Sequence, residues 1–133
     1  MSVRVEDLTR RMQKKVELFT FKMVNSGHSF MITSTYRSQE EQNAIYAQGR
    51  TAPGKVVTWT RNSRHTQRDA IDIALLNKGK PTWDLKIDID SDSVPDYTEA
   101  GVLGESCGLT WGGRWQTPDY AHFEDNGQEL EVE

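Results

Sequence analysis

The 133-residue sequence has one cysteine, Cys107, and no apolar run of the roughly 18 residues that a membrane span requires. A single cysteine excludes an internal disulfide and any metal site built from several thiolates. Basic residues are also scarce, because 16 lysines and arginines stand against 20 aspartates and glutamates, a net charge of −4. Nucleic-acid binding needs a basic face, so this balance argues against a nucleic-acid partner. Residues 1–16 lack the apolar block of a signal peptide, so we expect a cytoplasmic product without membrane insertion.

The residues that are present predict one α+β domain over residues 1–133, since no repeat, linker or low-complexity stretch divides the chain. Apolar side chains recur every three or four residues from Val5 to Met23, which predicts an amphipathic helix. Ser38 and Glu41 form a capping-box pattern that opens a second helix. The remaining expected elements are strands at 29–35, 56–60, 70–76, 109–111 and 121–124 and a helix at 98–107. Without a βαβ rhythm, this order favours a mainly antiparallel central sheet with flanking helices.

Two of the three histidines have acidic neighbours. His65 precedes Asp72 by seven residues, and His122 lies near the end of the chain. A catalytic zinc site takes three ligands from histidine and carboxylate and leaves one position open for water, and these three residues can supply that set. Asp72 alternates with two isoleucines in the expected strand, so its carboxylate points to the face opposite theirs. Buried there, it would need a cation as partner.

Asp119 stands three residues before His122, just ahead of the last expected strand. A carboxylate that lies beside a metal-bound water without ligating the metal can accept the water's proton and deliver it to a leaving amine. The plainer interpretation is that such histidines are core or surface residues and that an aspartate before a strand forms a turn. Composition and spacing alone leave both interpretations open.

A second acidic segment, residues 88–99, has the spacing of an EF-hand calcium loop. Its oxygen-bearing residues at positions 1, 3, 5, 9 and 12 are Asp88, Asp90, Asp92, Asp96 and Glu99. Ser93 replaces the usual turn glycine, and Pro95 replaces an aliphatic residue. These departures favour the alternative, an acidic surface loop whose aspartates cap the next helix. Should calcium bind, we expect it to order the loop beside the active site and to raise activity.

Four motifs occur in order along most of the chain. They are Thr35-Tyr36-Arg37-Ser38 followed by Gln42, then Ser63-x-His65 with Ala70-x-Asp72, then Trp111-Gly112-Gly113-x-Trp115, and last Asp119-x-x-His122. Together they resemble the zinc peptidase family of D-alanyl-D-alanine carboxypeptidases and L-alanyl-D-glutamate endopeptidases. One such motif is weak, but four in order, with the seven-residue step from His65 to Asp72, are specific.

The resemblance implies a DD-peptidase or hedgehog-like fold and seven site residues. The zinc ligands would be His65, Asp72 and His122, and the general base would be Asp119. Arg37 would act in catalysis with Asp119, and the substrate-binding residues would be Ser63 and Gln42. Arg37 would contact substrate or stabilise the oxyanion, a task that suits a permanently charged guanidinium, and Ser63 and Gln42 would line the cleft. The alternative for Arg37 is a surface ion pair with Glu40 or Glu41.

One position departs from the family pattern. Three residues after the first histidine the family usually has glycine, and here Arg68 stands in its place. If the backbone there requires a positive φ, arginine would be strained by roughly 1–2 kcal/mol. Alternatively, the loop has relaxed and Arg68 points into the cleft mouth to attract an acidic peptide.

The activity that the resemblance implies is hydrolysis of the stem peptide of bacterial peptidoglycan, preferably as an L-alanyl-D-glutamate endopeptidase. The alternatives are a D-alanyl-D-alanine carboxypeptidase using the same atoms and a non-catalytic, hedgehog-like zinc-binding module. A chain without a signal peptide or a separate cell-wall-binding domain also resembles the endolysins of phages. That likeness implies a monomer that accumulates in the host cytoplasm, is released by a holin and acts in the periplasm.

Overall fold

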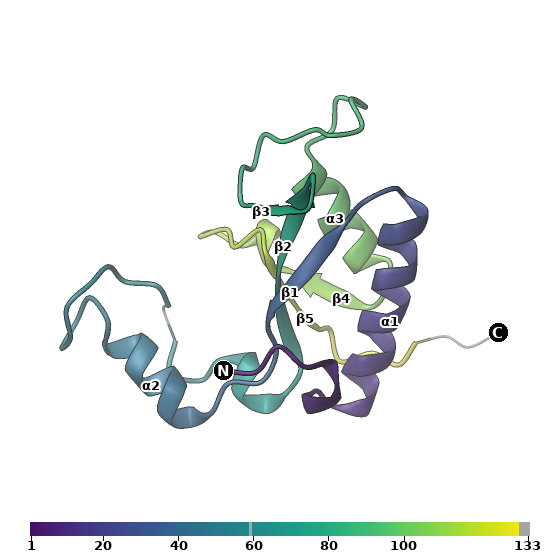
Figure 1. Ribbon diagram of the computed structural model, residues 1–133. Helices are drawn as coiled ribbons and strands as arrows, with labels where there is room; N and C mark the ends of the chain where they lie inside the picture. The colour runs from purple at the N-terminus through teal and green to yellow at the C-terminus, as the bar shows by residue number, and fades with distance from the viewer. Residues whose placement is uncertain (59, 131–133) are drawn as a thin grey trace.

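The computed structural model describes residues 1–58 and 60–130, in which one antiparallel sheet is flanked by helices (Figure 1). The strands are β1 (Phe30–Ser34), β2 (Ala70–Asn77), β3 (Lys80–Thr82), β4 (Leu109–Trp111) and β5 (His122–Asp125). The helices are α1 (Arg10–Asn25), α2 (Gln39–Ala47) and α3 (Asp96–Glu105), with short 3-10 helices η1 (Val5–Asp7), η2 (Arg64–Gln67) and η3 (Gly112–Arg114). The predicted single-domain α+β class with an antiparallel sheet is therefore confirmed.

Strand β2 is the centre of the sheet and sets the register of the functional residues. The strand order is β1-β2-β5-β4, and β3 pairs with the far end of β2 through a hairpin. In the β2–β5 ladder Asp72 lies directly opposite His122. Paired residues of an antiparallel ladder project on the same face, so the register alone brings these two side chains together.

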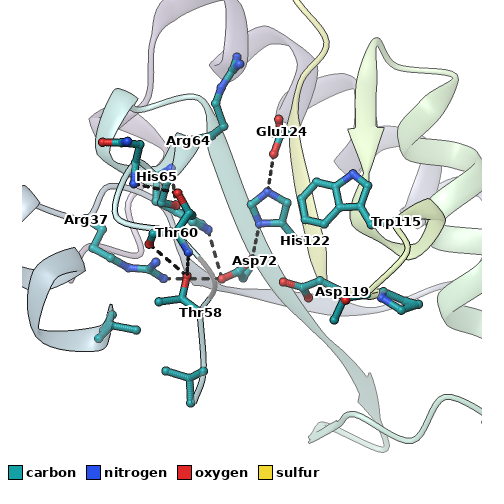
Figure 2. Close-up of a pocket in the computed structure, with 16 residues that line it drawn as sticks. Arg37, Thr58, Thr60, Arg64, His65, Asp72, Trp115, Asp119, His122 and Glu124 are labelled. Carbon is teal, nitrogen blue, oxygen red and sulfur yellow. Dashed lines mark hydrogen bonds and ion pairs between the residues drawn. The ribbon is translucent and has the colours of Figure 1, made fainter. Parts of the chain in front are cut away.

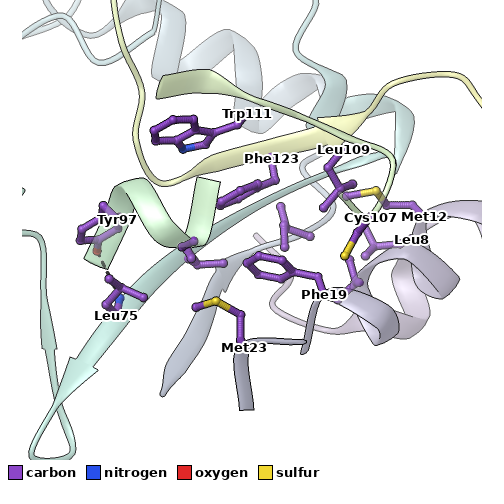
Figure 3. Packing of buried hydrophobic residues seen from close by; sticks show 14 residues of the cluster. Leu8, Met12, Phe19, Met23, Leu75, Tyr97, Cys107, Leu109, Trp111 and Phe123 are labelled. Carbon is purple, nitrogen blue, oxygen red and sulfur yellow. Dashed lines mark hydrogen bonds between the residues drawn. The ribbon is translucent and has the colours of Figure 1, made fainter. Parts of the chain in front are cut away.

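The hydrophobic core lies on one face of the sheet, beneath α1 and α3 (Figure 3). Ile71 and Ile73 are fully buried in it, whereas Asp72 between them projects to the opposite face with its side chain 25% exposed. The Phe19 and Phe123 rings pack with their centroids 5.0 Å apart and join α1 to β5. The core therefore fixes the strands and leaves the other face of β2 for chemistry.

Side-chain caps explain where α1 and α2 begin. The predicted capping box of α2 is confirmed, because Ser38 Oγ accepts the Glu41 amide at 3.1 Å and Glu41 Oε1 accepts the Ser38 amide at 3.0 Å. The first helix starts later than its apolar stripe predicted, since Thr9 accepts the Met12 amide as an N-cap.

Among the described residues, no helix combines the length and apolar character of a membrane span.

The expected strand at residues 56–60 is wrong. Residues 56–58 and 60 form an irregular segment, and residue 59 lies outside the described part of the chain. Hydrogen bonds from side chains hold this segment, with Gln42 Nε2 donating to the Thr60 carbonyl at 2.6 Å and Arg50 donating to the Thr58 carbonyl at 3.0 Å. The segment forms one wall of the cleft described below.

Candidate functional site

A cleft of about 810 Å³ opens where η2, β2 and β5 meet residues 57–63 and 115–119 (Figure 2). The sequence-predicted site residues that line it are Arg37, Ser63, His65, Asp72, Asp119 and His122. They come from segments up to 85 positions apart in the sequence, counted from residue 37 to residue 122. The fold thus brings six of the seven predicted residues into one cavity.

His65, Asp72 and His122 form a compact cluster in this cleft. Asp72 Oδ2 lies 3.2 Å from His65 Nε2, and Asp72 Oδ1 lies 3.0 Å from His122 Nδ1. One possible ligand atom from each of the three residues lies within 4.8 Å of the other two. Ser63 prepares this geometry from η2, because its Oγ accepts the His65 amide at 3.2 Å as the N-cap. Such a set of two imidazoles and one carboxylate can hold one divalent ion.

The second nitrogen of each imidazole is engaged away from the cluster. His65 Nδ1 donates to the Thr35 carbonyl at 2.7 Å, and this fixes the lone pair on Nε2. That Nε2 is buried and has no hydrogen-bond partner among the described residues. His122 Nε2 donates to Glu124 Oε1 at 2.9 Å, so in the neutral ring the lone pair is on Nδ1. His65 Nε2 and His122 Nδ1 therefore both face the Asp72 carboxylate, with the other ring nitrogen held as in metal-binding histidines.

Electrostatics in the cluster follow from these contacts. Burial opposes ionisation of Asp72, but its contacts with the His122 and His65 imidazoles outweigh it and hold the pKa of Asp72 well below its usual value. Burial likewise opposes protonation of His122, yet its bonds to Asp72 and Glu124 raise the pKa of His122 to about 9. Without a metal, the proton on His122 neutralises part of the negative charge of the cluster.

Asp119 stands at the cleft edge, close to the cluster but outside it (Figure 2). Asp119 is exposed, but partial desolvation of its carboxyl group raises the pKa of that group, and the Asp72 carboxylate raises this pKa further. Its backbone is held by Gly112, whose carbonyl accepts the Asp119 amide at 2.9 Å. A Cβ at Gly112 would lie 2.5 Å from the Asp119 carbonyl oxygen, so only glycine permits this approach. The carboxylate is thus placed to exchange a proton with a molecule bound in the cleft.

Arg37 reaches the cleft from the segment between β1 and α2. Its guanidinium donates to Gln42 Oε1 at 2.7 Å and lies 4.0 Å from Asp72 Oδ2, while the residue is only 9% exposed. The alternative of a surface ion pair is wrong: Glu41 instead pairs with the N-terminal amine of Met1. A nearly buried cation beside the cluster can stabilise negative charge that develops in the cleft.

The expectation that Gln42 lines the cleft is wrong. Gln42 is completely buried. Its Oε1 accepts a hydrogen bond from the Arg37 guanidinium, and its Nε2 donates to Thr58 Oγ1 and to the Thr60 carbonyl. An amide has a donor end and an acceptor end, so it can join a cation to the cleft wall. Gln42 is therefore a positioning residue that fixes the guanidinium and the wall together.

Arg68 has the left-handed backbone conformation that glycine would favour, with φ 64° and ψ 27°. The expectation that its side chain points into the cleft mouth is wrong, because it lies over the Tyr36 ring at 3.8 Å and donates to the Asp7 carbonyl at 2.9 Å. Stacking of this kind contributes roughly 0.5–1 kcal/mol. It offsets part of the roughly 1–2 kcal/mol strain of a left-handed arginine.

Sequence reasoning missed two groups that orient the histidines. Glu124 lies two residues after His122 in β5, and same-face spacing in a strand could have identified it. The Thr35 carbonyl carries no side-chain signature and could not be found in this way. Trp115 also borders the cleft, with its ring 5.1 Å from the His122 ring.

The acidic segment 88–99 joins β3 to α3. Ligand atoms of Asp88, Asp90, Asp92 and Glu99 lie within 4.8 Å of one another, and Asp96 begins α3. Burial raises the pKa of Glu99, and the neighbouring Asp92 carboxylate raises it further. The segment packs against residues 75–77 at the far end of β2. The expected position beside the active site is therefore wrong (Figure 1).

The described residues thus form an antiparallel α+β fold whose cleft holds a histidine–aspartate–histidine cluster, a donor set that can bind zinc. The family model described as D-alanyl-D-alanine carboxypeptidase matches residues 57–125 of this chain. The chain belongs to this peptidase family, as the sequence motifs indicated.

One curated relative is the peptidoglycan L-alanyl-D-glutamate endopeptidase CwlK of Bacillus subtilis (strain 168). The two sequences are 38% identical over 104 residues, which cover 75% of this chain and 62% of CwlK. The chain therefore spans less than two thirds of the length of this relative.

Solved structures share the fold. The L-Ala D-Glu endopeptidase ChiX of Serratia marcescens superposes with a TM-score of 0.68 at 20% identity, over 90% of this chain and 81% of ChiX. The LD-carboxypeptidase LdcB superposes with a TM-score of 0.67 at 15% identity, over 90% of this chain and 59% of LdcB. At these identities the likeness establishes the architecture alone.

Proposed function

We propose that this protein is a zinc-dependent endopeptidase that cleaves the L-alanyl–D-glutamate bond of the peptidoglycan stem peptide. The observation that carries the proposal is the convergence of His65, Asp72 and His122 in one cleft with Asp119 at its edge. The 38% identity to CwlK supports this choice of bond. In this proposal Ser63 and Arg37 border the bound peptide.

Zinc fits the cluster because of the donor set. His65 Nε2 is a buried nitrogen without a hydrogen-bond partner among the described residues, and His122 Nδ1 faces the same carboxylate of Asp72. Two nitrogens and one oxygen are a donor set that catalytic zinc sites use together with a water. Zinc held by these residues would lower the pKa of that water to about 7 and would polarise the carbonyl of the scissile bond.

The side chains around the cluster then divide the remaining work. Asp119 accepts the proton of the attacking water and passes it to the departing amine, so that nitrogen leaves as a neutral group. The Arg37 guanidinium stabilises negative charge on the oxygen of the attacked carbonyl. Glu124 and the Thr35 carbonyl hold the two imidazoles in the orientation that binding requires.

Zinc binding should depend on pH through His122. Its pKa of about 9 in the metal-free protein means that the ring carries an extra proton at neutral pH, and this proton must leave when zinc binds. We therefore expect zinc affinity to rise about tenfold per pH unit between about pH 7 and 8.5 and to level off above pH 9. Calorimetry at pH 7 in buffers of different ionisation enthalpy should show release of about one proton. Zinc binding without proton release would contradict the assignment of His122.

Gly112→Ala should slow catalysis without emptying the zinc site. The added methyl group would meet the Asp119 carbonyl oxygen at 2.5 Å and push the 115–119 segment outward. Misplacing a catalytic group by about 1 Å costs up to about 100-fold in rate, so we expect a 10- to 100-fold loss of turnover. Metal analysis and rate assays should be done side by side. Val102→Ala is the control, since Val102 is exposed on α3 and does not line the cleft, and equal rates for both variants would contradict the role of Gly112.

Mass spectrometry of digested Gram-negative peptidoglycan tests the proposed bond. The zinc-loaded protein should release peptides that begin with D-glutamate and leave L-alanine on the glycan, and a chelator should abolish the products until zinc is restored. Release of free D-alanine without that cleavage would support a D-alanyl-D-alanine carboxypeptidase, the activity that describes the family model. No product of either kind would support a non-catalytic zinc-binding module.

We further propose that residues 1–133 act as one monomeric domain and that the role is that of a phage endolysin released by a holin. The support for one domain is the single sheet and the single hydrophobic core that the described residues form. Expression in a Gram-negative host with and without a holin tests this role, since lysis should require both proteins. Lysis without the holin would contradict it.

A further inference from the structure

We propose that the segment 88–99, between β3 and α3, binds one calcium ion through its carboxylates. The segment is separate from the peptidase cleft, because it packs against the opposite end of β2 (Figure 1). The inference is therefore independent of the proposed zinc peptidase activity.

The carboxylates of the segment converge instead of spreading into solvent. Asp88, Asp90, Asp92 and Glu99 each place a ligand atom within 4.8 Å of the others. Asp90 and Glu99 also belong to a second such group, whose other members are Asp96 and His28. Four or five like charges at this separation repel one another, and a bound cation removes the repulsion. Carboxylate oxygens in this number suit calcium, a hard cation that takes six to eight oxygen ligands.

Two buried carboxylate oxygens in this cluster lack a partner, and they are the observation that points to a ligand. Asp96 is completely buried, and its Oδ2 accepts the Ile89 amide at 3.0 Å. The other oxygen, Oδ1, has no hydrogen-bond partner among the described residues. Glu99 repeats this pattern, since Oε2 is held by His28 Nε2 at 2.9 Å while the buried Oε1 has no described partner. Leaving a buried acceptor unsatisfied is costly, and a cation would satisfy both.

The backbone already has the shape that the bound loop requires. Ser93 has φ 71° at the position where EF-hand loops have glycine, so the replacement of glycine does not prevent the turn. Asp88 accepts the Asp92 and Ser93 amides at 3.2 and 2.9 Å, which closes the loop around the carboxylates. The following helix α3 begins at Asp96, the ninth residue of the loop.

Calcium at this site should stabilise the domain more than it changes catalysis. Asp96 anchors the segment to the start of α3, and the neighbouring Tyr97 hydroxyl bridges the Leu75 amide and the Thr82 carbonyl. His28 connects the same cluster to the segment after α1. A cation would therefore tie together α1, α3 and the β2–β3 hairpin, which border the core but not the cleft.

Calorimetry on the zinc-loaded protein, with calcium chloride as titrant, tests the inference. We expect one calcium ion per chain with a dissociation constant of about 10⁻⁴–10⁻³ M, the range of extracellular calcium modules. The melting temperature should rise in the same calcium range, whereas magnesium should bind more weakly because it demands a tighter octahedral shell. Absence of calcium uptake up to about 10 mM would overturn the inference.

Two variants and a matched control make the test specific. Asp90 and Glu99 belong to both groups of possible ligands. Asp90→Asn and Glu99→Gln each remove one negative charge, and each should weaken calcium binding at least tenfold. Asp90 is exposed, so its variant should fold even if that of Glu99 is unstable. Asp84→Asn is the control, because Asp84 lies in the same connection but outside both carboxylate groups, and its side chain accepts the Lys86 amide. Equal loss of calcium binding in the control, or none in the two variants, would overturn the assignment.

Discussion

Replacing Asp119 with alanine should leave zinc bound and lower the rate of stem-peptide hydrolysis by about 10²–10⁴-fold, the usual contribution of general acid–base catalysis. Asp119 stands at the cleft edge, and the metal-ligand cluster consists of His65, Asp72 and His122 without it. Zinc content and turnover should therefore separate in this variant. Both are measured on the same preparation, by metal analysis and by release of peptide from purified peptidoglycan.

Two further variants distinguish a chemical role of Asp119 from a structural one. Asp119→Asn keeps the shape of the side chain but cannot accept a proton, so it should be as slow as the alanine variant. Glu129→Gln removes a charge from an exposed side chain that pairs with Arg11 and does not line the cleft, so this variant should keep full activity. Turnover of Asp119→Ala within about twofold of the parent would show that another group is the base.

Replacing His122 with alanine should abolish both zinc binding and hydrolysis. The variant removes one of the three proposed ligands, so that only Asp72 and His65 remain to bind the metal. It also removes the 3.0 Å contact between His122 Nδ1 and Asp72 Oδ1. Loss of one ligand from a three-residue site lowers metal affinity by several orders of magnitude, so the metal should be lost on dialysis. Atomic absorption of the dialysed protein measures the remaining zinc.

The third histidine of the chain supplies the control. His28 lies outside the cleft and bonds Glu99, so His28→Ala should retain one zinc per chain and near-full activity. Stoichiometric zinc in dialysed His122→Ala would contradict the ligand set. Equal zinc loss in both variants would indicate unfolding, which a melting curve detects.

The metal cluster could be predicted because strand geometry encodes it. Asp72 stands between two isoleucines, so alternation placed it on the face away from the core, as the structure shows. The partner of Asp72 depends on the register between β2 and β5, which the sequence does not state directly. The order of the family motifs supplied that missing pairing.

The wrong expectations concern side chains that hydrogen-bond to residues beyond their immediate neighbours in the sequence. Residues 56–60 have the β-branched composition of a strand, yet Gln42 and Arg50 occupy their carbonyls in place of a neighbouring strand. Gln42 itself was assigned to the cleft because of its motif, but it lies beneath Arg37. Neither contact has a periodic signature, so local pattern reading could not find it.

The start of the first helix shows a smaller failure of the same kind. The apolar stripe from Val5 continues through Leu8 into the core, and Leu8 is buried as the stripe predicts. Thr9 nevertheless caps the helix, because its hydroxyl satisfies the Met12 amide that a helix start leaves open. The period of the apolar residues thus predicted which side chains are buried, whereas the Thr9 hydroxyl determines where α1 begins.

Anomalous X-ray scattering at the zinc absorption edge, from crystals of the zinc-loaded protein, tests the central claim most directly. We expect one strong peak in the cleft, about 2.0–2.2 Å from His65 Nε2, an Asp72 oxygen and His122 Nδ1, with Asp119 outside bonding distance. A peak ligated by other residues, or no peak in the cleft of a zinc-saturated crystal, would show that these three residues do not form a zinc site.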